Sequence, residues 1–461
     1  MNVAITLAYL LAAVLFILGL KQLSSPKGAR NGNFTAAAGM VIAIGATIPR
    51  LHFTVEGVAI IAIGVVIGAI VGSVGARMVK MTAIPQMVAL FNGVGGGAAA
   101  LVAVSELLTF GRNPAFSEAL PSVFSIVIGS ISFAGSMVAF AKLQELMTGT
   151  PITYPGQQLV NAVLAAAILG FAIAVLAVAS VPFSFVSLMV LALVLGVAFV
   201  LPIGGADMPV VISLLNAFTG LAVAASGFTL NNFALIVAGT LVGASGSLLT
   251  KLMSDAMGRS LTNTLFGAFG QVKTGAAGAT GGQARQVRAG TPEDLATLLA
   301  YSRRVIIVPG YGLAVAQAQH AVRELAELLE KRGVEVTYAI HPVAGRMPGH
   351  MNVLLAEANV PYDQLKEMDE INDEFKDADV ALVVGANDVV NPAARSSPGS
   401  PIYGMPILNA DRAKNIVFMK RSMRPGFAGI DNDLLYDPKT IMFFGDAKDS
   451  LTKLVNAVKA A

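Results

Sequence analysis

The chain has 461 residues, of which 55% are hydrophobic and only 13% are charged, and its mean hydropathy is +0.70. Soluble domains carry about 25% charged residues, so this composition points to a lipid environment. The net charge of +3, with no basic stripe, argues against a nucleic-acid partner. The absence of cysteine excludes disulfides, cysteine zinc sites and thiol catalysis.

Apolar segments fill the chain up to about Leu252, whereas the sequence from Arg285 onward has ordinary soluble composition. A helix needs about 20 apolar residues to cross a bilayer. The first apolar segment lacks the basic start and cleavage site of a signal peptide, so we expect a retained span. About nine spans are predicted, near 3–20, 34–50, 56–76, 84–108, 119–141, 158–180, 184–203, 209–226 and 231–252.

The basic residues of the loops predict the orientation of this bundle. With nine spans, the loops on the side of the C-terminal domain carry far more of them than the opposite loops, which fits the positive-inside rule. We therefore expect the C-terminal domain in the cytoplasm, or on the matrix side of a mitochondrial membrane, and the N-terminus outside. The first group is Lys21, Lys27, Arg30, Arg77, Lys80, Lys142, Lys251 and Arg259, against Arg50 and Arg112.

Three polar residues at membrane depth are candidates for an ion pathway. Asn92 lies in the middle of the fourth span, Asp207 lies at the start of the eighth, and Asn216 follows nine residues later. Polar side chains inside a membrane are costly and therefore tend to be functional. Interhelical hydrogen bonds of the asparagines, or a position of Asp207 near lipid headgroups, would explain the same residues without transport.

The sequence divides into a membrane domain at 1–252, a glycine-rich linker at 253–289 and a soluble domain at 290–461. Within the soluble domain, Arg304–Pro309 is predicted to be a buried strand. Gly310-Tyr311-Gly312 follows it and is predicted to open an amphipathic helix that runs to about Arg332. This strand, glycine turn and helix resemble a dinucleotide fingerprint, with Val315 in place of its third small residue.

The second strand, Val334–Ile340, ends at His341 without the acidic residue that binds the ribose of NAD. Arg346 and the run Lys420-Arg421-Ser422 could instead hold a 2′-phosphate through cations and a hydroxyl. A solvated strand end would explain Lys420 and Arg421 equally well. His341 and His350, which flank the Arg346 loop, are expected to be surface histidines or ligand contacts.

Four more strands are predicted at 380–384, 405–408, 416–419 and 441–444, which gives a doubly wound parallel sheet of six strands. Ligands sit at the carboxyl ends of the strands in such sheets. Two loops are therefore expected to contact a ligand, namely 385–392 and the glycine-bearing, lid-like segment 424–432. The fold class is thus a polytopic helical membrane bundle followed by an α/β Rossmann-like domain.

Motifs throughout the chain resemble the β subunit of proton-translocating NAD(P)+ transhydrogenase. Those in the membrane half are G-G-A-D-M-P-V-V-I-S-L-L-N at 204–216 and G-A-S-G-S at 243–247. Those in the soluble half are P-G-Y-G-L-A-V-A-Q-A-Q at 309–319, H-P-V-A-G-R-M-P-G-H-M-N-V-L-L-A-E at 341–357, M-D-E-I-N at 368–372, G-A-N-D-V-V-N-P-A at 385–393, K-R-S-M at 420–423 and G-D-A-K at 445–448.

The resemblance implies that the soluble domain binds NADP(H), inverted relative to ordinary Rossmann enzymes. It implies direct hydride transfer, for which the chain needs neither a catalytic residue nor a metal. The implied cofactor positions, together with the fingerprint, are Gly310, Tyr311, Gly312, Val315, Val343, Ala344, Gly345, Arg346, Met347, Pro348, Gly385, Ala386, Asn387, Asp388, Val389, Lys420, Arg421, Ser422, Met423, Arg424, Pro425, Gly426, Phe427, Asp446 and Ala447.

The resemblance also implies a partner. NADH would bind to an α subunit, and proton entry would drive NADPH formation in a bacterial inner membrane, with a dimer of the α/β assembly as the complete unit. Asp207 and Asn216 match channel-associated positions of the family. Many members carry a proton-relay histidine where Asn92 stands, so the relay histidine is expected on an α-subunit helix.

The composition leaves one other class of function open. A transporter or channel gated by a nucleotide-sensing domain would also combine membrane spans, a glycine linker and a nucleotide site. It would carry out no hydride transfer, and that difference separates the two interpretations.

Overall fold

The structure is a computed structural model. It describes residues 3–50, 54–79, 83–110, 115–148, 152–178, 182–204, 207–256, 287–345, 349–397, 400, 402–426 and 429–460. Contacts between Cα atoms divide the chain into two compact units, Met1–Thr250 and Lys251–Ala461. The predicted linker at 253–289 falls mostly on 257–286, which lie outside the described residues.

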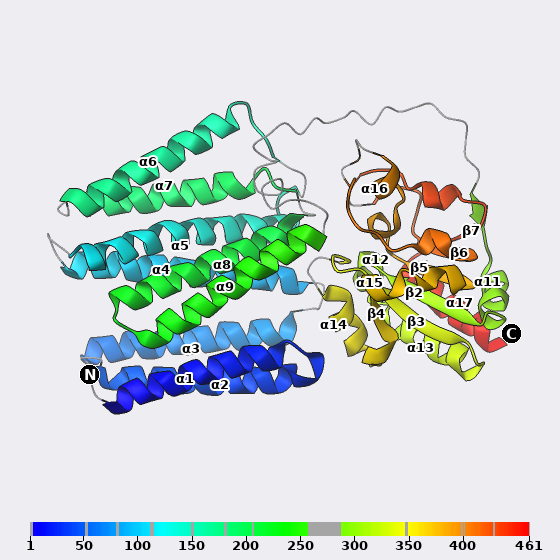
Figure 1. The fold of residues 1–461 in the computed structure, drawn as a ribbon, viewed down its shortest axis with the longest axis horizontal. Coiled ribbons are helices and arrows are strands. Elements are labelled where there is room, and N and C mark those ends of the chain that lie inside the picture. Colours follow the sequence, from blue (N-terminus) through cyan, green and yellow to red (C-terminus); the bar gives the residue numbers. More distant parts are fainter. Residues whose placement is uncertain are drawn as a thin grey trace. The chain divides into compact units, whose positions relative to one another are not determined.

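Long helices make up the first unit and lie side by side (Figure 1). The described residues contain a helix at each of the nine predicted spans. Seven are long and apolar enough to cross a membrane, and this confirms the predicted helical membrane bundle. The other two are α2 and α7; the apolar stretch found in α7 is Phe185–Val200. The helices are α1 Val3–Leu23, α2 Pro26–Thr47, α3 Val55–Met78, α4 Ile84–Phe110, α5 Phe116–Leu143, α6 Gln157–Val178, α7 Pro182–Val200, α8 Met208–Thr229 and α9 Phe233–Ala256.

Helix α2 begins eight residues before the predicted span at 34–50. The hydroxyl of Ser25 caps it by accepting a hydrogen bond from the Gly28 N–H at 3.2 Å, and Pro26 occupies the first position of the helix. Both residues favour a helix start. The prediction was wrong here because it followed hydropathy, and the polar first turns of α2 lower its hydropathy.

The centre of the bundle is α5, which packs against α4, α7 and α8. Glycines allow these backbones to touch. A Cβ atom on Gly129 of α5 would lie 2.6 Å from the Gly96 carbonyl oxygen of α4, and one on Gly196 of α7 would lie 2.6 Å from the Ile131 carbonyl oxygen. Such close approach is typical of helix packing in membranes. At the other extreme, no residue of α3 is buried within this chain.

The second unit is built on one parallel sheet, with strand order β1-β7-β6-β5-β2-β3-β4. Without β1 this is the order of a Rossmann sheet, with its switch point between β2 and β5. The predicted parallel-sheet domain is therefore confirmed. The strands are β1 Arg288–Ala289, β2 Arg304–Pro309, β3 Glu335–Ile340, β4 Leu365–Glu367, β5 Val380–Val384, β6 Asn415–Lys420 and β7 Thr440–Phe444.

Helices cover the sheet, and the central strands are buried on both faces. The amphipathic helices α11 (Pro292–Ala300) and α13 (Gln319–Lys331) both pack against the amphipathic helix α17 (Ala447–Ala460). A separate apolar cluster joins β2, β5 and β6 to the short helix α15, Met368–Ile371, and to the 3-10 turns that follow it. The remaining helices of the unit are α12 Tyr311–Val315, α14 His350–Glu357 and α16 Ala393–Ser396.

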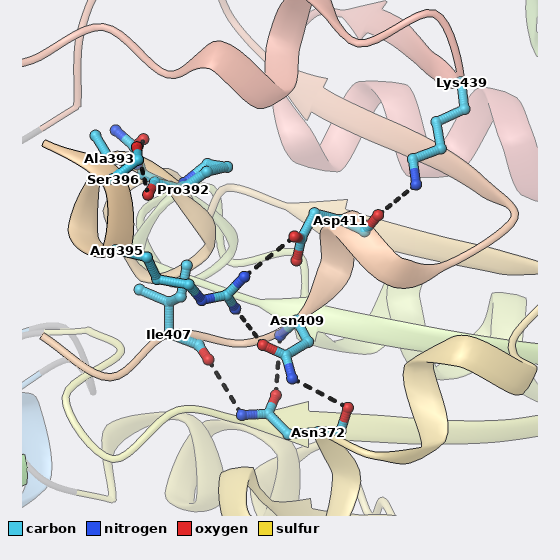
Figure 2. Close-up of polar contacts among 10 residues, drawn as sticks. Asn372, Pro392, Ala393, Arg395, Ser396, Ile407, Asn409, Asp411 and Lys439 are labelled. Atoms are coloured by element: carbon cyan, nitrogen blue, oxygen red, sulfur yellow. Dashed lines mark hydrogen bonds and ion pairs between the residues drawn. The ribbon is translucent and has the colours of Figure 1, made fainter.

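The predicted strand at 405–408 is wrong, because side chains and loop backbone, rather than a neighbouring strand, satisfy its backbone. Asn372 donates to the Ile407 carbonyl oxygen at 3.1 Å and accepts from the Asn409 N–H at 2.9 Å (Figure 2). Arg395 donates to Asn409 and Asp411, and Lys439 donates to the Asp411 carbonyl oxygen. Asn372, the last residue of the M-D-E-I-N motif, thus holds this segment in place.

We expect Asn372→Ala to lower the free energy of unfolding of the second unit by about 2 kcal/mol, since it leaves backbone groups of Ile407 and Asn409 without partners. Thermal unfolding of the full-length protein in detergent measures the loss. Asp369→Ala, an exposed position in the same short helix, is the control and should change stability by less than about 0.5 kcal/mol. Equal stability of the two variants would contradict this role of Asn372.

Candidate functional site

The predicted cofactor residues come from loops at one edge of the parallel sheet. The segments at 310–315, 343–348, 385–389, 420–427 and 446–447 follow the carboxyl ends of β2, β3, β5, β6 and β7. The register aligns Pro309 with Val384 and Lys420 with Phe444. Because all strands run the same way, these loops share the edge where ligands bind in open α/β sheets.

The glycines at the switch point allow two loops to touch. Gly310 N–H donates to the Val384 carbonyl oxygen at 3.0 Å, and Gly312 N–H donates to the Gly385 carbonyl oxygen at 2.9 Å. A Cβ atom on Gly310 would lie 2.4 Å from Ala386 Cα, and one on Gly312 would lie 2.7 Å from Gly385 Cα. Gly385 itself has a φ of +66°, which favours glycine. Contact between the loops therefore already requires all three glycines.

The helix predicted from this turn to Arg332 is wrong in its first part. Helix α12 ends at Val315, and Gln317 follows with a φ of +49° before α13 begins at Gln319. The apolar pattern does not reveal this break, because buried side chains continue through it at Ala318 and Val322. Val315, the third fingerprint position, is exposed.

Tyr311 and the loop after β3 are held together by His350. The ring centroids of Tyr311 and His350 lie 6.4 Å apart, and the planes are tilted by 57°. Gly345 has a φ of +102°, and a Cβ atom there would lie 2.4 Å from His350 Nδ1. The structure thus brings Tyr311 and Gly345 close together, as expected for two segments of one site.

His341 and His350 are both buried, which corrects the expectation of surface histidines. His341, 1% exposed, accepts a hydrogen bond from the Val343 N–H at Nδ1 and donates from Nε2 to the Pro406 carbonyl oxygen at 2.8 Å. This arrangement needs a neutral ring with its proton on Nε2. Burial lowers the pKa of His341 to about 4, against the weaker opposing effect of the Pro406 bond.

Lys420 joins the ends of β6 and β5. Its Nζ donates to Asn387 Oδ1 at 3.0 Å, and Asn387 in turn donates to Asp388 Oδ1 at 2.9 Å. Gly426 closes over this pair, since a Cβ atom on it would lie 2.5 Å from both side chains. Burial lowers the pKa of the Lys420 ammonium group, while Asp388 and Asp431 act in the opposite direction.

The other predicted positions differ in exposure. Arg421, Ser422, Arg424, Pro425 and Asp446 are exposed, whereas Gly310, Ala344, Ala386 and Ala447 are buried. The rest of the set is half-buried: Tyr311, Gly312, Val343, Gly345, Gly385, Asn387, Asp388, Val389, Lys420, Met423 and Gly426. Arg346, Met347, Pro348 and Phe427 lie outside the described residues. The described edge thus offers two exposed guanidinium groups and a hydroxyl beside the partly buried Lys420.

In the first unit, Asn92 belongs to a buried cluster of hydroxyl groups. Asn92, 9% exposed, donates to Ser136 Oγ at 3.0 Å and to Ser132 Oγ at 3.3 Å. Ser132 Oγ also lies 2.6 Å from Thr219 Oγ1 on α8. The cluster thus joins α4, α5 and α8 within the bundle.

Two further pairs of hydroxyl groups continue along the same face of α5. Ser125 Oγ lies 2.8 Å from Ser226 Oγ, and Ser122 Oγ lies 3.2 Å from Thr229 Oγ1. These residues are not among those predicted from the sequence. Their helical spacing at 122, 125, 132 and 136, with Gly129 between, was the signal that could have found them.

Asp207 immediately precedes α8, and Asn216 lies within it, about two turns further along. Asp207 is the half-buried residue that precedes α8, and its N–H donates to the Gly204 carbonyl oxygen at 3.1 Å. Asn216 is half-buried and lies one turn before Thr219, which donates to the Asn92 carbonyl oxygen at 3.4 Å. The structure therefore places Asn216 beside the Asn92 cluster and Asp207 at the end of the bundle.

Over the described ranges, no group of three or more His, Cys, Asp or Glu side chains could hold a metal ion.

Comparison with known proteins yields one family. The family model of the NAD(P) transhydrogenase beta subunit matches residues 5–457. Two curated relatives, both NAD(P) transhydrogenase subunit beta from Rhodospirillum rubrum, are each 50% identical to this chain over 460 residues. The match covers 98% of this chain and 98% of each relative.

The buried His341 predicts a loss of stability in acid. Its pKa is about 4 in the folded protein against an ordinary 6.5. The preference of the fold for the neutral ring therefore contributes fully to stability above pH 6.5, and this contribution is lost as the pH falls to 4. The loss amounts to about 3 kcal/mol. Hydrogen exchange of β3 amides in the full-length protein, corrected for intrinsic rates, measures it. His341→Gln should lack this pH-dependent loss, whereas the exposed His320→Gln should retain it; identical pH profiles for all three proteins would exclude His341 as the cause.

Proposed function

Since the chain belongs to the family of NAD(P) transhydrogenase beta subunits, we propose that it binds NADP(H) and carries protons across a membrane for the complete enzyme. It is one subunit of an oxidoreductase that uses nicotinamide nucleotides and works with an alpha subunit. Hydride would pass directly from NADH on the alpha subunit to NADP+ on this chain. Residues 1–252 would form the proton channel, 253–289 the linker and 290–461 the nucleotide domain.

The observation that carries this proposal is the set of loops at the carboxyl edge of the Rossmann sheet, around the switch point. Loops that touch through Gly310, Gly312 and Gly385 bring backbone groups to this edge without side chains in the way. Among the residues that the structure describes, one Gly-x-Gly turn, Gly310-Tyr311-Gly312, lies between a strand and a helix. This fits an NAD(H) site on the alpha subunit.

The charges at this edge favour NADP(H) over NAD(H). Strand β3 ends at the buried His341, so the position that holds a ribose-binding carboxylate in NAD sites holds a neutral ring. Arg421, Ser422 and Arg424 are exposed at the end of β6. A guanidinium fork with a neighbouring hydroxyl suits a dianionic 2′-phosphate.

The nucleotides supply hydride donor and acceptor, so this chain needs no nucleophile or acid–base pair. Its own residues would bind the nucleotide and orient it. Arg421 and Ser422 would hold the 2′-phosphate, Lys420 fixes Asn387 of the neighbouring loop, and Gly426 closes over that loop. Correct apposition of the two reacting groups is the contribution that proteins make to such transfers.

The buried hydroxyl clusters support a proton route through the first unit. Asn92, Ser132, Ser136 and Thr219 form hydrogen-bonded links between α4, α5 and α8, and Asn216 lies one turn away. Hydroxyl groups both donate and accept, so they can pass a proton along a chain of hydrogen bonds. Asp207 at one end of the bundle would be the carboxylate that exchanges protons with the aqueous side.

We place this chain in the inner membrane of a bacterium, with nucleotide domain cytoplasmic and N-terminus outside. The support is the excess of basic residues in the loops on that side. Helix α3 is apolar with no buried residue, so its surface is available to lipid or to helices of the alpha subunit. A dimer of the alpha/beta assembly would be the complete enzyme, and the proton-relay histidine would be on the alpha subunit.

Reconstitution with the alpha subunit in lipid vesicles tests this function. We expect NADH-dependent reduction of NADP+ that speeds up under an inward proton gradient and slows down when an uncoupler is added. Asp207→Asn should reduce the gradient-driven rate at least about tenfold, while the variant should still bind NADP(H). Asp255→Asn, at an exposed carboxylate on α9, is the matched control and should behave as the wild type.

Two outcomes would refute parts of this proposal. Nucleotide-dependent ion flux without hydride transfer would instead identify a transporter with a nucleotide-sensing domain. Normal gradient-driven turnover of Asp207→Asn would remove Asp207 from the proton route.

Arg421→Ala tests the nucleotide preference. Loss of a charge-assisted bond to the 2′-phosphate should weaken NADP(H) binding about tenfold to a hundredfold and leave NAD(H) binding unchanged. Equilibrium titration of the full-length protein with each nucleotide measures both. Arg332→Ala, an exposed arginine just before β3 at the opposite edge of the sheet, should change neither; equal loss for both nucleotides would argue against a 2′-phosphate site.

A further inference from the structure

Lys142 is a basic residue that the structure buries inside the helical unit. The sequence predicts Lys142 to be one of the loop cations, but it lies in the last turn of α5 and is only 3% exposed. Its Nζ donates to the Leu201 carbonyl oxygen at 2.5 Å and to the Ile203 carbonyl oxygen at 2.7 Å. The ammonium group therefore binds the peptide groups that follow α7, which corrects the expectation that Lys142 is a loop cation.

Burial of the Lys142 ammonium group carries a free-energy penalty, so we expect the residue to have a specific role. An ammonium group has three donors and no acceptor, and its burial is tolerated only when those donors are satisfied. Carbonyl groups at the end of a helix carry partial negative charge and attract a cation. An apolar residue at 142 would fill the same space without this requirement.

The segment that Lys142 holds leads directly to Asp207. Ile203, whose carbonyl oxygen accepts from Lys142, is followed by Gly204, and the Gly204 carbonyl oxygen accepts from the Asp207 N–H at 3.1 Å. Two further hydrogen bonds bind the same region: Ile152 N–H donates to the Leu201 carbonyl oxygen, and Gln86 donates to the Leu143 carbonyl oxygen.

These contacts lie at one end of the bundle. Helices α5, α7 and α9 finish there, and α4, α6 and α8 begin there (Figure 1). Lys142 thus stands where the connection from α7 to α8 meets the end of α5. A change in this contact would move the start of α8 relative to the hydroxyl cluster around Asn92.

We propose that Lys142 is a positioning residue for proton transfer: its ammonium group clamps the connection between α7 and α8 and thereby sets the place of Asp207 at the mouth of the proton route. This inference rests on the proposed function. Lys142 acts through Asp207 and does not itself touch nucleotide or bind the transferred hydride.

The test uses full-length variants reconstituted with the alpha subunit, each assayed for NADH-dependent reduction of NADP+ with and without a proton gradient. Lys142→Met should reduce the gradient-driven rate about tenfold to a hundredfold, since misplacing a reacting group by about 1 Å has effects of this size. Lys142→Arg, which can still donate to the carbonyl groups, should restore much of the rate. Both variants should still bind NADP(H), which would show that the nucleotide domain is intact.

A double-mutant cycle separates positioning from a purely structural role. If Lys142 acts through Asp207, the Lys142→Met, Asp207→Asn double variant should be no slower than Asp207→Asn alone. Lys251→Met, at an exposed lysine on α9, is the matched control and should behave as the wild type.

Three outcomes would overturn the inference: a wild-type rate for Lys142→Met, losses that multiply in the double variant, or equal rates for the Met and Arg variants at reduced thermal stability. If Lys142→Met does not assemble, the cycle is run with Lys142→Arg and Lys142→Gln. Failure of the proposed function would look different, because the wild type itself would then show no gradient-driven hydride transfer.

Discussion

The structure depends on one constraint: a polar group that leaves water must find its partner inside the protein. In the helical unit this constraint joins Asn92 of α4 to Ser132 and Ser136 of α5, and it fixes Lys142 to the carbonyl groups after α7. In the second unit the same constraint places the His341 ring against the Pro406 carbonyl oxygen. An unpaired buried group would cost about 1–3 kcal/mol, so each of these contacts restricts where neighbouring segments can lie.

The sequence predicts elements wherever a single local pattern decides the structure. Long apolar runs predict the membrane helices, and short apolar runs followed by a glycine predict β2, β5 and β7, because hydrophobic burial alone decides both. The predictions fail where another interaction competes. Ser25 and Pro26 start α2 within polar sequence, Gln317 breaks an amphipathic helix, and side chains satisfy the backbone of the segment at 405–408.

In the candidate site, too, some features can be predicted from local sequence and others depend on contacts between distant residues. Strand direction is enough to predict that the loops after β2, β5 and β6 meet at one edge. Which atoms touch there depends on tertiary contacts, so neither the bond from Lys420 to Asn387 nor the packing of Gly310 against Ala386 could be predicted. The glycines illustrate the difference: the fingerprint assigns Gly310 and Gly312 to a pyrophosphate, whereas in the structure the neighbouring loop alone already excludes a side chain.

The proposed function restricts how proton movement can be coupled to hydride transfer. Hydride transfer between two nicotinamides takes no proton from the protein, so a proton in the bundle can affect the reaction only by changing how nucleotides bind or face each other. Coupling of this kind is reciprocal: nucleotide binding must change proton affinity in the bundle by the same free energy. Contacts that fix the ends of helices, such as the one between Lys142 and the segment before Asp207, are where such a change can be transmitted, because a small shift there moves a whole helix.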